Sequence, residues 1–317
     1  MIIDCHVHVC AMLPGHGITT PKLRRRPSFA FMRWRLGIPF FADDAGIEQA
    51  VAAKLVETVQ QTTELDAVVV LAFDGVHTAD GQFDAARTQL YVTNDYVIDL
   101  VRQHPKMYFG ASIHPYRKDA IAELERCVAA GAALMKWLPL VQDIDPTDRR
   151  CLEFYDALAH HKLPLLSHTG GEMSLPYTNY AYADPELLLP AIQRGVTVIA
   201  AHCGTRATPF ETDFLPKFVR LTKEHEHLYG DTAALNLPLR SYAYKTLLDD
   251  EAVRKKLVHG SDWPIISVPP ARAGLWTAMK LFMTDNNWLR RDVLAKRAMG
   301  LGEDYWQRAA TLLRTVR

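Results

Sequence analysis

Eight short, almost entirely apolar segments recur along the chain and limit the folds that it can adopt. Each has the length of a β-strand, and strands that are apolar on both faces are typical of a parallel sheet covered by helices. Amphipathic patterns between them predict helices, for example at 120–130 and 149–160, with Asp119 and Thr147 as the expected N-caps. The eight segments occupy residues 2–8, 67–73, 107–114, 133–138, 163–168, 197–202, 228–234 and 257–262.

Eight strands that alternate with helices predict an α/β protein, a (β/α)8 TIM barrel formed by one domain of residues 1–317. Most strand ends follow one another at close to the roughly 31 residues expected when about 250 residues form eight units. The first interval is about twice as long, because it contains residues 9–46, a stretch rich in Pro, Gly, Arg and aromatic residues. We expect this insertion to be a long loop or lid at the end of the first strand that distorts the barrel. Terminal helices from about residue 293 onwards are expected to close it.

Composition excludes several classes of protein. The 36 Lys and Arg residues balance the 36 Asp and Glu residues, which argues against a nucleic-acid partner. The chain has no run of about 18 apolar residues, so we expect no membrane partner. The N-terminus has no basic flank or apolar signal core, and the 5 cysteines form no C-x-x-C pair. We therefore expect a cytoplasmic protein with free thiols.

Polar side chains gather at the ends of the apolar segments. His6 and His8 stand two residues apart on the first segment, so both side chains point to the same face. Lys136 interrupts an apolar run, where its ammonium is costly unless it is paired, neutralised or able to reach solvent at the rim. Three further segments end in His168, His202 and Asp262. Each residue alone has an ordinary structural explanation, but active sites of barrels are built at the carboxyl ends of the strands. The set therefore predicts one shared site.

This set of residues resembles the metal site of the amidohydrolase superfamily. The resemblance consists of His-x-His on the first strand, a lysine on the fourth, histidines on the fifth and sixth and an aspartate on the eighth. Wider segments, such as Asn94-Asp95-Tyr96 and 260–264 (Gly-Ser-Asp-Trp-Pro), are similar to the amidohydrolase-related branch that contains decarboxylases, lactonases and hydratases. That branch often has Lys-x-His-Pro on the fourth strand, whereas this chain has Lys136-Trp137-Leu138-Pro139.

The resemblance implies a set of metal ligands. His6, His8 and Asp262 would bind a first divalent ion, zinc or alternatively manganese. If Lys136 is carboxylated, its carbamate would bridge two ions, with His168 and His202 on the second. If Lys136 is unmodified, one ion is expected, His168 joins the first set and His202 polarises the substrate. Because this chain has a suitable residue at every ligand position of the two-ion site, two ions are favoured.

The same resemblance implies a metal-dependent hydrolase that cleaves an amide, lactone or ester. A metal-activated water would attack, Asp262 would act as general base and then acid, and the metal or His202 would stabilise the oxyanion. The arginines and aromatic residues of 9–46 suit a small cyclic or aromatic carboxylate as substrate, or alternatively a solvated basic loop or a contact between subunits. Candidate substrate contacts are His114, Glu172 and Arg206.

Two alternatives remain open. The first is a non-oxidative decarboxylase on the same scaffold, with one metal that holds an aromatic or dienoic acid. The second is a barrel that only binds a ligand. The resemblance also allows a homodimer, since dimers are common in that family; the only other partner we expect is the small-molecule substrate.

Overall fold

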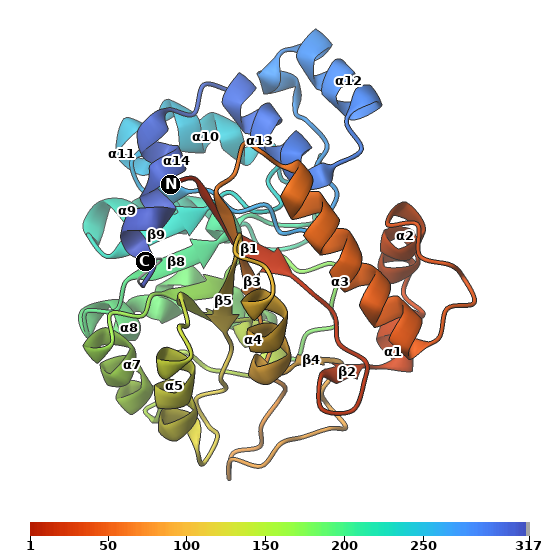
Figure 1. Ribbon diagram of the computed structural model, residues 1–317. Helices are drawn as coiled ribbons and strands as arrows, with labels where there is room; N and C mark the ends of the chain where they lie inside the picture. The colour runs from red at the N-terminus through yellow and green to blue at the C-terminus, as the bar shows by residue number, and fades with distance from the viewer. Residues whose placement is uncertain (315–317) are drawn as a thin grey trace.

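The computed structural model describes residues 1–314 and contains one curled sheet of eight parallel strands (Figure 1). The strands lie in the order β1-β3-β5-β6-β7-β8-β9-β10. Their bounds are Ile3–His8, Ala67–Leu71, Met107–Ala111, Leu134–Trp137, Leu165–His168, Val198–Ala201, Leu228–Asp231 and Leu257–Val258. Each falls within one of the eight apolar segments of the sequence. The (β/α)8 fold class is therefore confirmed.

Helices alternate with these strands and cover the outer face of the sheet. They are α3 (Asp44–Gln61), α4 (Asn94–Arg102), α5 (Ala120–Ala129), α6 (Pro139–Gln142), α7 (Arg150–His160), α8 (Leu189–Gln193), α9 (Leu215–Glu224), α10 (Ala243–Asp249), α11 (Glu251–Arg254), α12 (Leu275–Thr284), α13 (Trp288–Ala298) and α14 (Glu303–Leu312). Short 3-10 helices occur at Tyr180–Ala183, Pro185–Leu188, His202–Gly204 and Ala271–Ala273. Trp137 of β6 shows how the two layers meet, because its ring stacks on Phe154 of α7 with centroids 5.5 Å apart. Within residues 1–314, no helix combines the length and the apolar character that a membrane span needs.

The two expected N-caps behave differently from the prediction. Asp119 is the N-cap residue of α5, but its side chain makes no capping bond and pairs with Arg117 instead. Thr147 does not cap α7, because this helix begins at Arg150 with Arg149 in the N-cap position, two residues after Thr147. The prediction for Thr147 is therefore wrong, and its hydroxyl and backbone N–H donate to the side chain of Asp145 instead.

The interior of the barrel is a separate apolar cluster. Ile3, Leu134 and Ile199 belong to it, and Ala309 of α14 and the following Leu313 pack against its lower end. Helix α14 contacts β1 and β10 and lies beside the N-terminus in Figure 1. The expected terminal helices are therefore α13 and α14, while residues 315–317 lie outside the described part of the chain.

The barrel closes between β1 and the segment that follows β10. The N–H of His8 donates to the carbonyl of Trp263 at 2.8 Å, and the N–H of Asp262 donates to the carbonyl of His6 at 2.8 Å. These bonds join the two ends of the sheet at the carboxyl end of β1. The first and last strands, which are farthest apart in the sequence, are thus neighbours.

A bulge in β1 decides which of its side chains face the barrel interior. The register between β1 and β3 shifts between Asp4 and Val7, so β1 contains one more residue than β3 over this stretch. A β-bulge of this kind reverses the face to which the following side chains point. Ile3 therefore faces the interior before the bulge, and His8 faces it after the bulge, although one residue number is odd and the other even.

The insertion at 9–46 contains regular structure where the sequence predicts a loop. Strand β2 (Gly17–Thr19) pairs antiparallel with β4 (Leu90–Val92), and the helices α1 (Pro21–Arg24) and α2 (Pro27–Arg35) follow. Pro21 and Pro27 begin these helices, as the fixed φ of proline favours at a first helical position. Figure 1 shows α1 and α2 beside α3, at the side of the barrel.

Loss of a large side chain from the barrel interior should destabilise the fold. Leu134 is fully buried there, so Leu134→Ala is expected to lower the free energy of unfolding by about 2–5 kcal/mol in urea denaturation. Leu239 is 48% exposed, and Leu239→Ala should change it by less than about 0.5 kcal/mol. Equal effects of the two substitutions would contradict the assignment of the interior cluster.

Candidate metal centre

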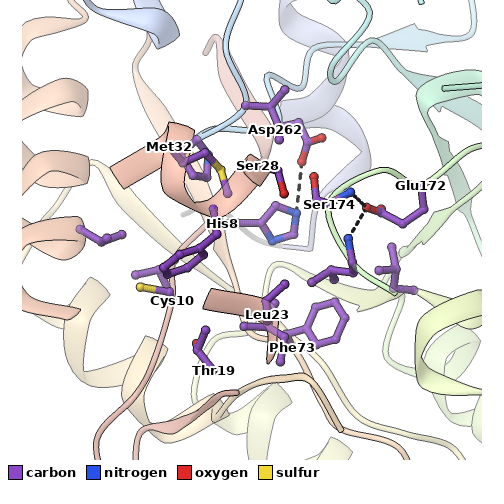
Figure 2. Close-up of a pocket in the computed structure, with 18 of the residues that line it drawn as sticks. His8, Cys10, Thr19, Leu23, Ser28, Met32, Phe73, Glu172, Ser174 and Asp262 are labelled. Carbon is purple, nitrogen blue, oxygen red and sulfur yellow. Dashed lines mark hydrogen bonds and ion pairs between the residues drawn. The ribbon is translucent and has the colours of Figure 1, made fainter. Parts of the chain in front are cut away.

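Three side chains converge where the barrel closes. His6 Nε2 and His8 Nε2 are 3.1 Å apart, and Asp262 Oδ1 lies 3.4 Å from the first and 3.3 Å from the second. Figure 2 shows His8 and Asp262 facing each other. In a tetrahedral zinc site with bonds of about 2.0–2.1 Å, two ligand atoms stand about 3.3–3.4 Å apart. The spacing of these three donor atoms therefore fits one divalent ion, with no rearrangement of the chain.

The carboxylate of Asp262 is ionised in this setting. Burial acts to raise the pKa of Asp262, but the neighbouring His6, His8 and Lys136 lower it overall. The backbone of Asp262 has a φ of 66°, which is uncommon for a residue other than glycine and is typical of functional sites. The N–H of the same residue donates to the carbonyl of His6 in β1, so this backbone conformation lies where the barrel closes.

His6 is oriented by a carboxylate behind it. Its Nδ1–H donates to Asp231 Oδ2 at 2.7 Å, so its Nε2 presents a lone pair to the ligand set. Burial lowers the pKa of His6 well below its ordinary value, and the nearby charge of Lys136 lowers it further. Asp231 Oδ1 also accepts the N–H groups of His202 and Ala233, at 2.8 and 3.1 Å. A carboxylate–histidine pair of this kind commonly supports a bound metal.

The sequence analysis missed Asp231. Asp231 ends β9, but the apolar segment of the sequence continues to residue 234, so in the sequence Asp231 lies inside the segment and not at its end. A charged residue within an apolar run is the signal that could have identified it, and its carboxylate holds the candidate ligand His6 from behind.

Lys136 faces the same point from β6. Its side chain is fully buried, and its Nζ lies 3.1 Å from His6 Nε2. Burial lowers the pKa of Lys136 from its ordinary value. The alternative that its amine reaches solvent at the rim is therefore excluded. Carboxylation of this amine stays a prediction.

His202 is fixed as a hydrogen-bond acceptor toward the cavity. Its Nδ1–H donates to the carbonyl of Ala233 at 2.8 Å, which leaves Nε2 unprotonated in the neutral ring. Burial, together with nearby Arg240, lowers the pKa of His202 well below its ordinary value. In this tautomer Nε2 can act as a metal ligand or a proton acceptor, whereas donation to an oxyanion requires a second proton on the ring. The polarising role of His202 stays a prediction.

His168 and Glu172 form the next part of the site. The ring of His168 lies 4.7 Å from that of His202, centroid to centroid, and its Nε2–H donates to the carbonyl of Gly171 at 3.1 Å. Its Nδ1 therefore faces the carboxylate of Glu172, 3.9 Å away. The other oxygen of Glu172 accepts backbone N–H groups, including that of Ser174, as Figure 2 shows. Glu172 lies beside the cavity, but one of its two carboxylate oxygens is used to hold the loop that carries it.

All these side chains share one cavity, which has an empty volume of about 1020 Å³ including its open mouth. The residues that the sequence predicted as ligands all line it: His6, His8, Lys136, His168, His202 and Asp262. The structure therefore places the whole predicted ligand set and Glu172 around one space.

The other two expected substrate contacts lie elsewhere. His114 is fully buried, its Nε2–H donates to the carbonyl of Gln142 at 2.9 Å, and burial lowers its pKa to about 3. The guanidinium of Arg206 lies over the ring of Tyr242, 5.3 Å from its centroid. Neither residue is among the described side chains that line the cavity. Their contact with substrate stays a prediction, which their positions outside the lining of this cavity do not support.

A buried arginine supports the loop that carries Glu172. The guanidinium of Arg240 donates to the carbonyl of Gly171 and, at 2.9 Å, to the hydroxyl of Thr205. Burial lowers the pKa of Arg240, and the carboxylates of Glu172 and Asp262 act against this effect. Arg240 lies in the loop after β9, away from any strand end, so the sequence offered no pattern that could identify it.

Polar ligand residues at the carboxyl ends of barrel strands define the general class to which this chain belongs, the (β/α)8 barrels with a site at that end. Several solved structures share the fold. An uncharacterized TIM-barrel protein from Bordetella bronchiseptica superposes with a TM-score of 0.61 at 16% identity, covering 95% of this chain and 98% of the other. A Pseudomonas putida protein named as a 2-pyrone-4,6-dicarboxylic acid hydrolase gives 0.57 at 14% identity, over 99% and 94% of the two chains. The 5-carboxyvanillate decarboxylase from Sphingomonas paucimobilis gives 0.51 at 13% identity, over 94% and 98%.

The family itself is shown by the sequence. The amidohydrolase family profile matches residues 3–296, which is nearly the whole chain. The chain therefore belongs to the amidohydrolase family, as the resemblance predicted. A comparison with curated protein sequences finds no match. Members of this family are enzymes and are generally metal-dependent, and the set of His6, His8 and Asp262 provides a candidate site.

Removal of the charge behind His6 should weaken metal binding. Asp231→Asn keeps the size of the side chain but lowers its strength as an acceptor, so we expect zinc affinity to fall by about 10- to 100-fold. The measurement is zinc titration of the metal-free protein by calorimetry. Asp99→Asn, at a side chain that is 72% exposed, is the matched control. Unchanged affinity in Asp231→Asn would contradict the orienting role of this carboxylate.

Proposed function

We propose that this protein is a metal-dependent hydrolase that cleaves an amide, lactone or ester bond, with His6, His8 and Asp262 as ligands of a divalent ion. Zinc is the proposed ion and manganese the alternative, since neutral imidazoles and a carboxylate suit both. When bound, such an ion supplies Lewis acidity that activates water and polarises a carbonyl. The observation that carries the proposal is the convergence of three donor atoms at 3.1–3.4 Å.

Asp262 is the proposed proton carrier. Its side chain is 15% exposed, and it lines the cavity, so its carboxylate is within reach of a water that attacks a bound carbonyl. It accepts the proton of that water and returns it to the leaving group. His6 and His8 hold the oxygen of Asp262 from one side, which leaves its second oxygen for this task.

Lys136 and the two deeper histidines complete the proposal. As an ammonium, Lys136 donates to the negative charge that develops on the carbonyl oxygen. As a carbamate, it adds an anionic ligand, and His168 and His202 then have room for a second ion. The acceptor tautomer of His202 supports a ligand role. Both forms are hydrolases, so the proposed reaction does not depend on this choice.

Metal removal tests the proposal directly. Dialysis against a chelator should reduce the hydrolysis of neutral test esters and lactones by about 1000-fold or more, because the ion contributes several kcal/mol to the transition state. Addition of zinc or manganese should restore the rate, with metal content measured by mass spectrometry. Full activity in the metal-free protein would overturn the proposal. Release of carbon dioxide from aromatic acids, without ester hydrolysis, would favour the decarboxylase alternative instead.

Asp262→Asn tests the proton carrier. The amide cannot accept the proton, so we expect kcat to fall by about 100- to 10,000-fold, measured on the zinc-loaded protein. The surface variant Asp99→Asn should keep the wild-type rate. Zinc content should be measured for each variant, since Asp262 is also a proposed ligand. A zinc-loaded Asp262→Asn protein with wild-type kcat would favour a barrel that only binds its ligand.

A further inference from the structure

Beyond the ligand set, the cavity is lined mostly by apolar side chains. Figure 2 shows Leu23, Met32 and Phe73 around His8. The wall has contributions from the insertion and from the opposite side of the barrel, which include Leu23, Phe29, Met32, Ile38, Phe73 and Leu175. The few polar groups of the wall are partly used within the protein, since the hydroxyl of Thr19 donates to the carbonyl of Ala11 at 2.8 Å. The insertion therefore extends the site with an apolar chamber.

Three arginines of the insertion, Arg24, Arg26 and Arg33, have partners within the protein. Arg24 forms an ion pair with Asp44, and the guanidinium of Arg26 donates to a backbone carbonyl at 3.1 Å. Arg33 is the one arginine among the described lining residues, and it donates to the carbonyls of residues 39 and 40, at 2.6 and 3.1 Å. These partners favour a structural role for the three arginines, and binding of a substrate carboxylate by them stays a prediction. Their sequence positions were informative about charge, but not about the direction of long side chains.

We propose that the substrate carries an uncharged aliphatic or aromatic group that fills this chamber while its reacting carbonyl lies at the His6–His8–Asp262 set. This inference rests on the proposed function for the position of the carbonyl. The physical reason is that an apolar group gains by leaving water for an apolar wall, by about fourfold in affinity per fully buried methylene. Among the described lining residues the cations are Arg33, which donates to two backbone carbonyls, and Lys136 at the ligand set, so a carboxylate among the apolar side chains of the wall would lose its hydration. The substrate class is thus neutral esters, lactones or amides with a bulky apolar part.

A chain-length series in the wild-type protein tests this inference. The substrates are p-nitrophenyl acetate, butyrate, hexanoate and octanoate, with the mono-p-nitrophenyl ester of octanedioic acid as the charged analogue of the last. With the zinc-loaded protein, kcat/KM should rise with chain length by up to about fourfold per methylene, until the chamber is full. The charged analogue should be at least about tenfold poorer than the octanoate ester.

Binding without chemistry separates this inference from the proposed reaction. The metal-free protein is titrated with 2-butanone, 2-hexanone and 2-octanone, which displace the neutral fluorescent probe N-phenyl-1-naphthylamine. Affinity should rise along the series, whereas octanedioate should not displace the probe. Chain-length-dependent binding with no ester hydrolysis would support the substrate class and overturn the hydrolase. Hydrolysis or binding that does not depend on chain length, or that prefers the charged analogue, would overturn the substrate class.

Two neighbouring residues of α2 offer a matched pair of variants. Met32 lines the chamber, while Phe31 is 42% exposed and is not among the described lining residues. Met32→Lys should flatten the dependence of ketone affinity on chain length, and Met32→Leu should preserve it. Phe31→Lys places the same charge on the same helix and should leave the dependence unchanged. The same dependence of ketone affinity on chain length in Met32→Lys and Phe31→Lys would contradict the assignment of the chamber. If Met32→Lys does not fold, the chain-length series in the wild-type protein still tests the inference.

Discussion

Backbone hydrogen bonds between β1 and the segment after β10 hold the two ends of the eight-stranded sheet together. The pairs are His8 to Trp263 and Asp262 to His6, each at 2.8 Å. The three candidate ligands lie at this seam, since His6, His8 and Asp262 all take part in the bonds that close the barrel. The uncommon φ of 66° at Asp262 belongs to this seam, and the surrounding bonds compensate for the strain. A chain that failed to close here would lose the site along with the fold.

The rest of the site prepares neutral imidazoles with lone pairs directed inward. His6 is held by the carboxylate of Asp231 and His202 by the carbonyl of Ala233, so that both Nε2 atoms are free of protons. Burial keeps both rings neutral. These buried nitrogen atoms have lost their contact with water, which is unfavourable unless another partner replaces it. A bound cation would be such a partner, so the arrangement suits a metal.

The sequence predicts the eight strands, and the six residues that it proposes as ligands line one cavity. Both outcomes follow from the spacing of apolar residues and from the position of polar residues at strand ends. Apolar segments report burial on both faces, and carboxyl ends of parallel strands meet at one end of a barrel. The bulge in β1, the tautomer of His202 and the support from Arg240 could not be predicted in this way. They arise from contacts between residues far apart in the chain. The arginines of the insertion show the same limit, since Arg24 and Arg33 end at partners that only the folded chain brings near.

The central claim is that a divalent cation binds between β1 and Asp262. The most direct measurement is anomalous X-ray diffraction at the zinc absorption edge, from crystals of the zinc-loaded protein. We predict an anomalous peak about 2.0–2.2 Å from His6 Nε2, His8 Nε2 and a carboxylate oxygen of Asp262. A zinc-loaded crystal with no peak between these side chains, or with its peak at other residues, would contradict it.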